Sequence, residues 1–158
     1  MSKKYWLFKS EPDVFSIYDL DASEDRTTYW DGIRNYQARN FLRDEIKPGD
    51  NVLFYHSNTN PNIVAGTCKV VKEGYPDFTA FDPGSNYFDP KSSKDKPTWF
   101  MVDIKLVKIF TKPVTLNEIR KNKKLQNMKL IQRGNRLSII PVTKQEFDEI
   151  VKMSSDKI

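Results

Sequence analysis

Three short segments of the sequence gather side chains that suit ligand binding. In the first, Lys9, Ser10 and Glu11 place a cation, a hydroxyl and a carboxylate directly after an aromatic run. The end of a strand is where a rigid scaffold presents polar groups to a ligand. The same residues also fit a plain turn into the next helix, and the sequence alone leaves both interpretations open.

The second segment, residues 29–40, combines aromatic rings with arginine and asparagine. Trp30 precedes Gly32, and Arg34, Asn35 and Arg39 then crowd the first turns of a predicted helix. Free amides and the positive end of the helix dipole make such a helix start suitable for phosphate. Trp30 fits either a place in the core or a stacking surface for a base, where such contacts contribute about 1–3 kcal/mol.

The third segment contains Arg133, Gly134 and Arg136. A guanidinium group binds phosphate through two parallel hydrogen bonds, and glycine permits close approach of the backbone. A solvent-exposed turn with two arginines also explains these residues.

The residue counts argue against several kinds of site. One cysteine, Cys68, and one histidine, His56, rule out a multi-histidine metal site, a zinc knuckle and an internal disulfide. We expect Cys68 to be reduced and buried, and His56 to be a structural residue. The glycines form no phosphate-binding loop motif. No catalytic residue, metal or cofactor is predicted.

Positive charge is concentrated late in the chain. Residues 105–136 hold ten basic residues and one acid, so this segment carries +9 and the remainder −4 of the net +5. Such asymmetry predicts a cationic face that attracts polyanions. The same numbers of basic and acidic residues would also result if the lysines only kept the surface of an exposed helix in contact with water.

The hydrophobic pattern predicts the elements that must position these side chains. Strands are expected at residues 5–12, 52–57, 63–72, 99–110 and 137–142, and a helix within residues 36–46. Residues 21–28, 58–62 and 77–97 are predicted as loops. Helix starts are predicted at Ser16, Asn35, Thr115 and Thr143.

This order of elements predicts an α+β fold with a small curved sheet or barrel and flanking short helices, in one domain spanning residues 1–158. A parallel doubly wound sheet is disfavoured because regular βα alternation is missing. The sequence contains no run of 18 apolar residues and no signal-peptide core. We therefore expect neither a membrane protein nor a secreted one. The expected location is the cytoplasm if the host is bacterial and the nucleus if it is eukaryotic.

Taken together, the segments resemble the EVE domain family. The resemblance runs from about Tyr5 to Val151. The residues that carry it are 5–12, 29–40, 52–58, 75–77, 88–92, 99–103 and 133–138. It implies a PUA-like fold related to YTH and ASCH domains, and a reader of modified bases in DNA or RNA to which no catalytic activity is attributed. In the related YTH readers, a Lys-Ser pair and a tryptophan help to form the pocket, and a late basic residue holds phosphate.

We therefore expect a base flipped from its stack to lie against Trp30, with Lys9 at the pocket and Tyr55 as the second aromatic wall. The polar edge of a methylated or hydroxymethylated base would be read by Ser10, Glu11 and Asn35. The phosphate backbone would be held by Arg34, Arg39, Arg133 and Arg136, with the Lys-rich segment behind them.

Two other classes stay open. One is an enzyme acting on a modified nucleotide, with Glu11 or Asp31 as its acid or base. The other is a small-molecule or protein-binding module whose basic residues only contact water and bind no nucleic acid. The sequence does not choose between DNA and RNA, and it does not indicate an oligomeric state.

Overall fold

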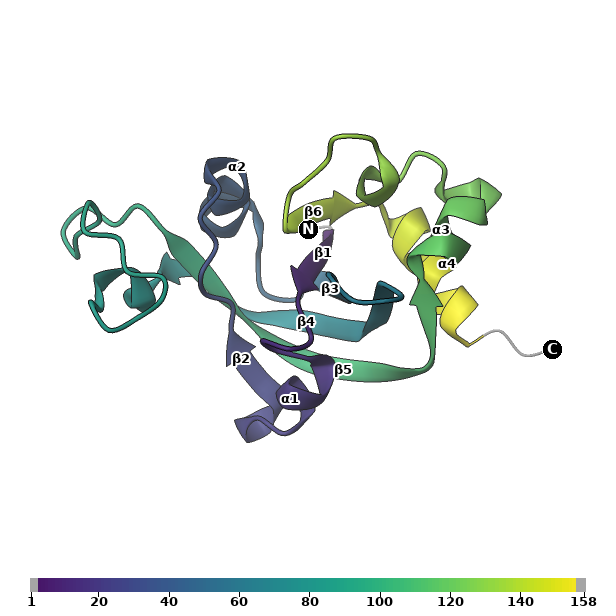
Figure 1. Ribbon diagram of the computed structural model, residues 1–158, viewed down its shortest axis with the longest axis horizontal. Helices are drawn as coiled ribbons and strands as arrows, with labels where there is room; N and C mark the ends of the chain where they lie inside the picture. The colour runs from purple at the N-terminus through teal and green to yellow at the C-terminus, as the bar shows by residue number, and fades with distance from the viewer. Residues whose placement is uncertain (1–2, 156–158) are drawn as a thin grey trace.

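A curved, open sheet of six strands forms the centre of the structure, a computed structural model that describes residues 3–155 (Figure 1). The strand order is β2-β5-β4-β3-β1-β6. The strands are β1 (Tyr5–Ser10), β2 (Thr27–Tyr29), β3 (Asn51–His56), β4 (Ile63–Pro76), β5 (Phe100–Thr115) and β6 (Ile139–Val142). This is the predicted α+β class, with an open sheet in place of a closed barrel.

Short helices lie on both sides of the sheet. The α-helices are α1 (Ile17–Asp21), α2 (Tyr36–Asn40), α3 (Leu116–Lys121) and α4 (Lys144–Ser154). The shorter helical turns are η1 (Glu24–Arg26), η2 (Phe41–Glu45), η3 (Phe78–Phe81), η4 (Lys123–Leu125) and η5 (Lys129–Ile131). Within residues 3–155, no helix has the length and apolar character needed to cross a bilayer.

The neighbouring strands β1 and β3 run parallel, whereas every other neighbouring pair is antiparallel. Ser10 lies opposite His56, and the amide of Ser57 donates to the carbonyl of Ser10 at 2.9 Å. Because the two strands point the same way, their carboxyl ends meet at one edge of the sheet. The polar residues that follow β1 therefore lie beside those that follow β3.

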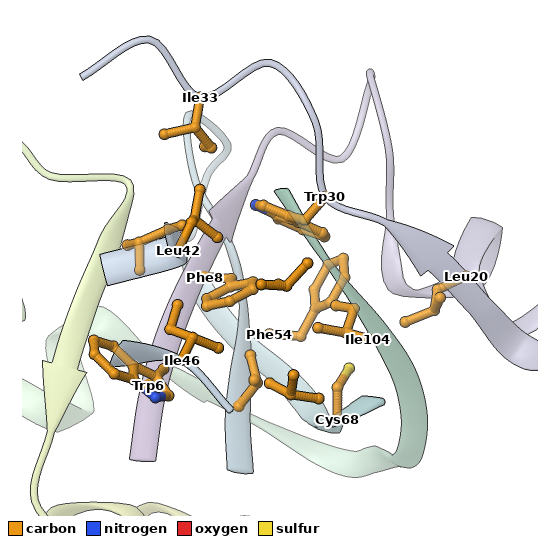
Figure 2. Packing of buried hydrophobic residues seen from close by; sticks show 14 of the residues in the cluster. Trp6, Phe8, Leu20, Trp30, Ile33, Leu42, Ile46, Phe54, Cys68 and Ile104 are labelled. Carbon is orange, nitrogen blue, oxygen red and sulfur yellow. The ribbon is translucent and has the colours of Figure 1, made fainter. Parts of the chain in front are cut away.

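Each face of the sheet has its own hydrophobic core. Trp6 and Phe8 belong to one cluster and Leu7 to the other, because successive side chains of a strand point to opposite faces. The first cluster includes residues of α1, α2 and η2, and the second includes residues of α3 and α4. Figure 2 shows the first cluster, with Trp30 packed next to Phe8 and Phe54.

The predicted helix starts are confirmed. Ser16, Thr115 and Thr143 each form a capping box with the residue three positions on, and the Asn35 side chain accepts from the amide of Ala38. The prediction of a loop over residues 21–28 is wrong at its end, where Thr27 begins β2 and pairs with Lys105 of β5. A three-residue strand carries too little periodicity to be recognised from its own sequence.

His56 has the predicted structural role. Its ring is buried at the end of β3, and Nε2 accepts the amide of Ile17 at 3.0 Å, where α1 begins. Burial lowers the pKa of His56, and the nearby Asp19 opposes this effect. A protonated imidazole has no acceptor lone pair, so the observed hydrogen bond requires the neutral ring.

We expect the free energy of unfolding to fall as the pH drops below the ordinary His56 pKa of 6.5. Below that pH the unfolded chain binds a proton that the folded chain binds only at lower pH. His56→Gln keeps a hydrogen-bond acceptor but does not titrate in this range. Urea unfolding between about pH 7.5 and about pH 5 should therefore show a smaller loss of stability for the variant than for the wild type. Equal losses would contradict this account of His56.

Candidate functional site

A cavity of about 580 Å³ opens where the carboxyl ends of β1 and β3 meet the loop after β2. This volume is in the range of small-molecule and cofactor pockets, about 300–1,000 Å³. The residues that line it are Lys9, Ser10, Glu11, Val14, Phe15, Thr28, Tyr29, Trp30, Asp31, Gly32, Ile33, Arg34, Ser57, Tyr87, Arg136 and Ser138. Six of the predicted site residues are therefore brought together here.

Trp30 is part of both the core and the cavity wall. Its side chain is only 7% exposed, and its ring lies 5.3 Å from Phe8, 5.5 Å from Phe54 and 6.5 Å from Phe15, measured between ring centroids. Its amide donates to the carbonyl of Val102 at 2.8 Å. The ring is therefore fixed on the sheet and presents only a small part of its surface to the cavity.

Within residues 3–155 the indole N–H of Trp30 has no hydrogen-bond partner, in contrast to those of the other two tryptophans. Trp6 Nε1 donates to Asp50 at 3.1 Å and Trp99 Nε1 donates to Asp89 at 2.7 Å. Trp30 Nε1 has no hydrogen-bond acceptor among residues 3–155. Within the same residues, every fully buried side-chain nitrogen or oxygen has a hydrogen-bond partner, so Trp30 Nε1 is not one of the fully buried atoms. The Trp30 N–H therefore keeps some solvent-exposed surface.

Asp77 holds the loop that forms one side of the cavity. Its carboxylate is fully buried and accepts from the amide of Gly32 at 2.9 Å, from Arg34 Nη1 at 3.1 Å and from both the amide and the hydroxyl of Thr79. The loop after β2 is thereby joined to η3, which lies 45 residues later in the chain.

Arg34 lines the cavity, but its guanidinium group is already bound. Besides Asp77, it donates through Nη2 to the carbonyl of Tyr87 at 2.6 Å. Its Cζ lies 5.7 Å from the ring centroid of Tyr87 and 5.3 Å from that of Trp99. These contacts give Arg34 a positioning role in the wall and leave it few donors for a phosphate.

Two cations and two carboxyl groups complete the polar lining. Lys9 is half-buried and forms no ion pair with residues 3–155, and burial lowers its pKa. Arg136 is exposed at the opening. Glu11 accepts from Asn58 Nδ2 at 2.9 Å. Burial and the neighbouring charge of Asp77 raise the pKa of Asp31, against the weaker effects of its own backbone amide and of Arg34.

Four predicted site residues lie outside the cavity lining. Asn35 is the exposed N-cap of α2, and Tyr55 is buried in the second core cluster on the opposite face of β3 from Phe54. Arg39 donates to the carbonyl of Thr98 at 2.7 Å. Arg133 is exposed in the turn at Gly134. None of the four positions supports a contact with a ligand in this cavity.

Two residues that organise the cavity were not predicted. Tyr87 and Asp77 come from the segment before β5, which was predicted as a loop over residues 77–97 with no individual residue assigned to the site. Within residues 3–155, no group of three or more His, Cys, Asp or Glu side chains could hold a metal ion.

The predicted single cationic face is not assembled at the cavity. Lys105 pairs with Asp25 at 3.1 Å, and Lys124 lies 3.9 Å from Glu149 of α4. Figure 1 shows α3 and α4 together at the end of β5, on the other side of the molecule from the loop that carries η3. Of the basic residues between 105 and 136, Arg136 lines the cavity.

Comparisons with known proteins match this chain, over most of its length, to one family and to solved structures. The family described as EVE domain matches residues 4–153. Thymocyte nuclear protein 1 of Homo sapiens is 43% identical over 166 residues, which cover 94% of this chain and 73% of that protein. A crystal structure of human THYN1 protein in complex with 5-methylcytosine containing DNA matches with a TM-score of 0.91 and 42% identity, covering 99% of this chain and 100% of that one. A hypothetical protein from Leishmania major also has a TM-score of 0.91, with 48% identity, covering 97% of this chain and 95% of that one.

Gly32 and Gly134 provide a matched test of the cavity wall. Both have a positive φ, 78° and 82°, so alanine should destabilise either site by about 1 kcal/mol through backbone strain. A Cβ at Gly32 would lie 2.7 Å from Tyr87 Cζ, whereas a Cβ at Gly134 meets nothing within 4 Å. Urea unfolding should therefore show a larger loss of stability for Gly32→Ala than for Gly134→Ala. Equal losses would mean that Tyr87 does not pack firmly on this wall.

Proposed function

The chain belongs to the EVE domain family, and we propose that it is a non-catalytic nucleic-acid-binding protein that holds a modified base in the cavity beside Trp30. One observation carries this proposal: a cavity large enough for a nucleobase, lined by two cations without an ion-pair partner and by an indole N–H without an acceptor among residues 3–155, in a fold shared with a protein crystallised on DNA containing 5-methylcytosine. We take DNA as the partner because that relative was crystallised with it.

The base enters after it has flipped out of its stack, which is unfavourable by a few kcal/mol. Its ring lies between Trp30 and Tyr87, which line the same cavity. Because Trp30 is almost fully buried, it contributes a rigid wall and the donor Nε1–H, and Tyr87 contributes the more exposed ring. A misfit would leave the indole N–H without a partner at a cost of about 1–3 kcal/mol.

The phosphate backbone is held by Lys9 and Arg136. A half-buried lysine with no carboxylate partner among the described residues is electrostatically unsatisfied, and a phosphate would supply the missing charge. Arg136 lies at the exposed side of the same cavity. This assignment replaces Arg34, Arg39 and Arg133, whose positions favour other roles.

A protein that binds a base and returns it unchanged needs no nucleophile or metal. The relatives named thymocyte nuclear protein 1 suggest the nucleus as the location in a eukaryotic host, and we propose the cytoplasm for a bacterial host. Incubation with 5-methylcytosine oligonucleotides should therefore return them chemically intact, and a modified or released base would indicate an enzyme instead.

The base-binding role of Trp30 is tested by Trp30→Phe. Phenylalanine keeps an apolar ring in the core but lacks the N–H, so the variant should still fold. We expect it to bind oligonucleotides with 5-methylcytosine about tenfold more weakly, with a smaller loss for unmodified ones. Fluorescence anisotropy with both oligonucleotides measures the ratio. An unchanged preference would remove Trp30 from base recognition.

The phosphate-binding role of Arg136 is tested against Arg133, three residues earlier and outside the cavity. Arg136→Ala should weaken binding of modified and unmodified oligonucleotides alike, and should lower the slope of log affinity against log salt by about one. Arg133→Ala makes the same change of charge and should leave the slope nearly unchanged. Equal effects of the two variants would contradict the placement of the phosphate at the cavity.

A further inference from the structure

The hydroxyl group of Ser10 already donates its proton within the protein. Ser10 Oγ donates to the carbonyl oxygen of Phe15 at 2.6 Å. A serine hydroxyl has one proton and two lone pairs, so this bond uses the proton and leaves the lone pairs. Ser10 Oγ therefore acts only as an acceptor toward any further group.

The Phe15 carbonyl keeps the Ser10 hydroxyl in this orientation. Within residues 3–155 the carbonyl accepts no other hydrogen bond, and its bond to Ser10 is partly buried. If the hydroxyl turned to donate to a ligand, the carbonyl would lose its partner in a place that water reaches only in part, which is unfavourable. The donor and acceptor sides of Ser10 are therefore not interchangeable.

The Ser10 side chain lies on the same face of the sheet as Trp30. Phe8 and Ser10 are two positions apart on β1, so their side chains point to the same face. The ring of Phe8 lies 5.3 Å from that of Trp30, and the ring of Phe15 lies 6.5 Å from it, measured between centroids. Ser10, Phe15 and Trp30 all line the cavity, and Ser10 is half-buried there. The free lone pairs of Ser10 Oγ are therefore beside the indole wall.

An acceptor at this position excludes the DNA backbone as the partner of Ser10. Phosphate oxygens are themselves acceptors and bind cations and N–H groups. The deoxyribose of an internal nucleotide has no free hydroxyl group, in contrast to the ribose of RNA. The donors that DNA can offer to Ser10 are therefore the N–H groups of its bases.

We propose that Ser10 Oγ accepts a hydrogen bond from the exocyclic amino group of the base in the cavity. In cytosine and 5-methylcytosine, this amino group is the one N–H donor, because ring N3 and O2 are acceptors and N1 is bonded to the sugar. Ser10 thus adds a fixed acceptor to the cavity wall that Trp30 forms. The inference rests on the proposed function, because it requires a base in the cavity.

The test removes the amino group from the ligand. Two short DNA duplexes differ at one position, which carries either 5-methylcytosine or 5-methylpyrimidin-2-one opposite an abasic site. The pyrimidinone has a hydrogen atom in place of the amino group and keeps the methyl group, N3 and O2, and the abasic site removes the difference in base pairing. Thymine is unsuitable for this comparison, because its N3–H is a donor that Ser10 could also accept. We expect the wild type to bind the 5-methylcytosine duplex about tenfold more tightly, measured by fluorescence anisotropy.

Ser10→Ala removes the acceptor from the protein. This variant should bind the two duplexes with nearly equal affinity, because neither amino group nor hydrogen atom then meets an acceptor at this position. A purely structural role of Ser10, in holding Phe15, would instead lower both affinities alike and leave their ratio unchanged. Ser57→Ala is the matched control, because it removes another hydroxyl group of the lining whose side chain has no hydrogen bond with residues 3–155. It should keep the wild-type ratio.

The outcomes separate the inference from the proposed function. If the wild type binds neither duplex nor the matching RNA, the proposed function is wrong and the inference falls with it. If the wild type binds both duplexes equally, the inference alone is overturned, and this result needs no variant. The inference is also overturned if Ser10→Ala keeps the full ratio or if Ser57→Ala loses as much of it. Partial misfolding of a variant does not disturb the test, because it lowers both measured affinities alike.

Discussion

The cavity depends on one buried charge, the carboxylate of Asp77. Burying an ionised group costs several kcal/mol unless its oxygens are fully hydrogen-bonded, and loss of one partner leaves that cost uncompensated. Its oxygens accept from Gly32, Arg34 and Thr79, and its own amide donates to the carbonyl of Trp99 at 2.9 Å. One residue therefore fixes the loop after β2, the start of η3 and the segment that enters β5 against one another. The loop that contains Trp30 and Asp31 is held on one side by this arrangement, through the amide of Gly32.

The features that the sequence predicted well are those determined by nearby residues. The capping boxes at Ser16, Thr115 and Thr143 depend on side chains three positions apart, and the strand pattern of β5 depends on alternation along one segment. The short edge strand β2 was missed because its three residues become a strand only by pairing with β5, about 76 residues later in the chain.

The site was predicted in part for the same reason. Lys9, Ser10 and Trp30 stand where a strand or loop ends, which the sequence marks directly. Tyr55 was placed at the cavity although its side chain points to the opposite face of the sheet, and alternation alone does not tell which face holds a cavity. The contributions of Asp77 and Tyr87 depend on contacts across more than 40 residues, for which a single sequence contains no signal.

The walls of the cavity come from the beginning, the middle and the last quarter of the chain, from Lys9 to Ser138. No fragment of the sheet can form them, because β1 needs both β3 and β6 as neighbours and the loop after β2 needs Asp77. Binding of an oligonucleotide in the cavity is therefore coupled to folding of the whole sheet. An oligonucleotide present at a hundred times its dissociation constant would stabilise the native state against unfolding by about 2.7 kcal/mol. The protein bound to an oligonucleotide would consequently be protected from proteolysis, and the unbound protein would be degraded first.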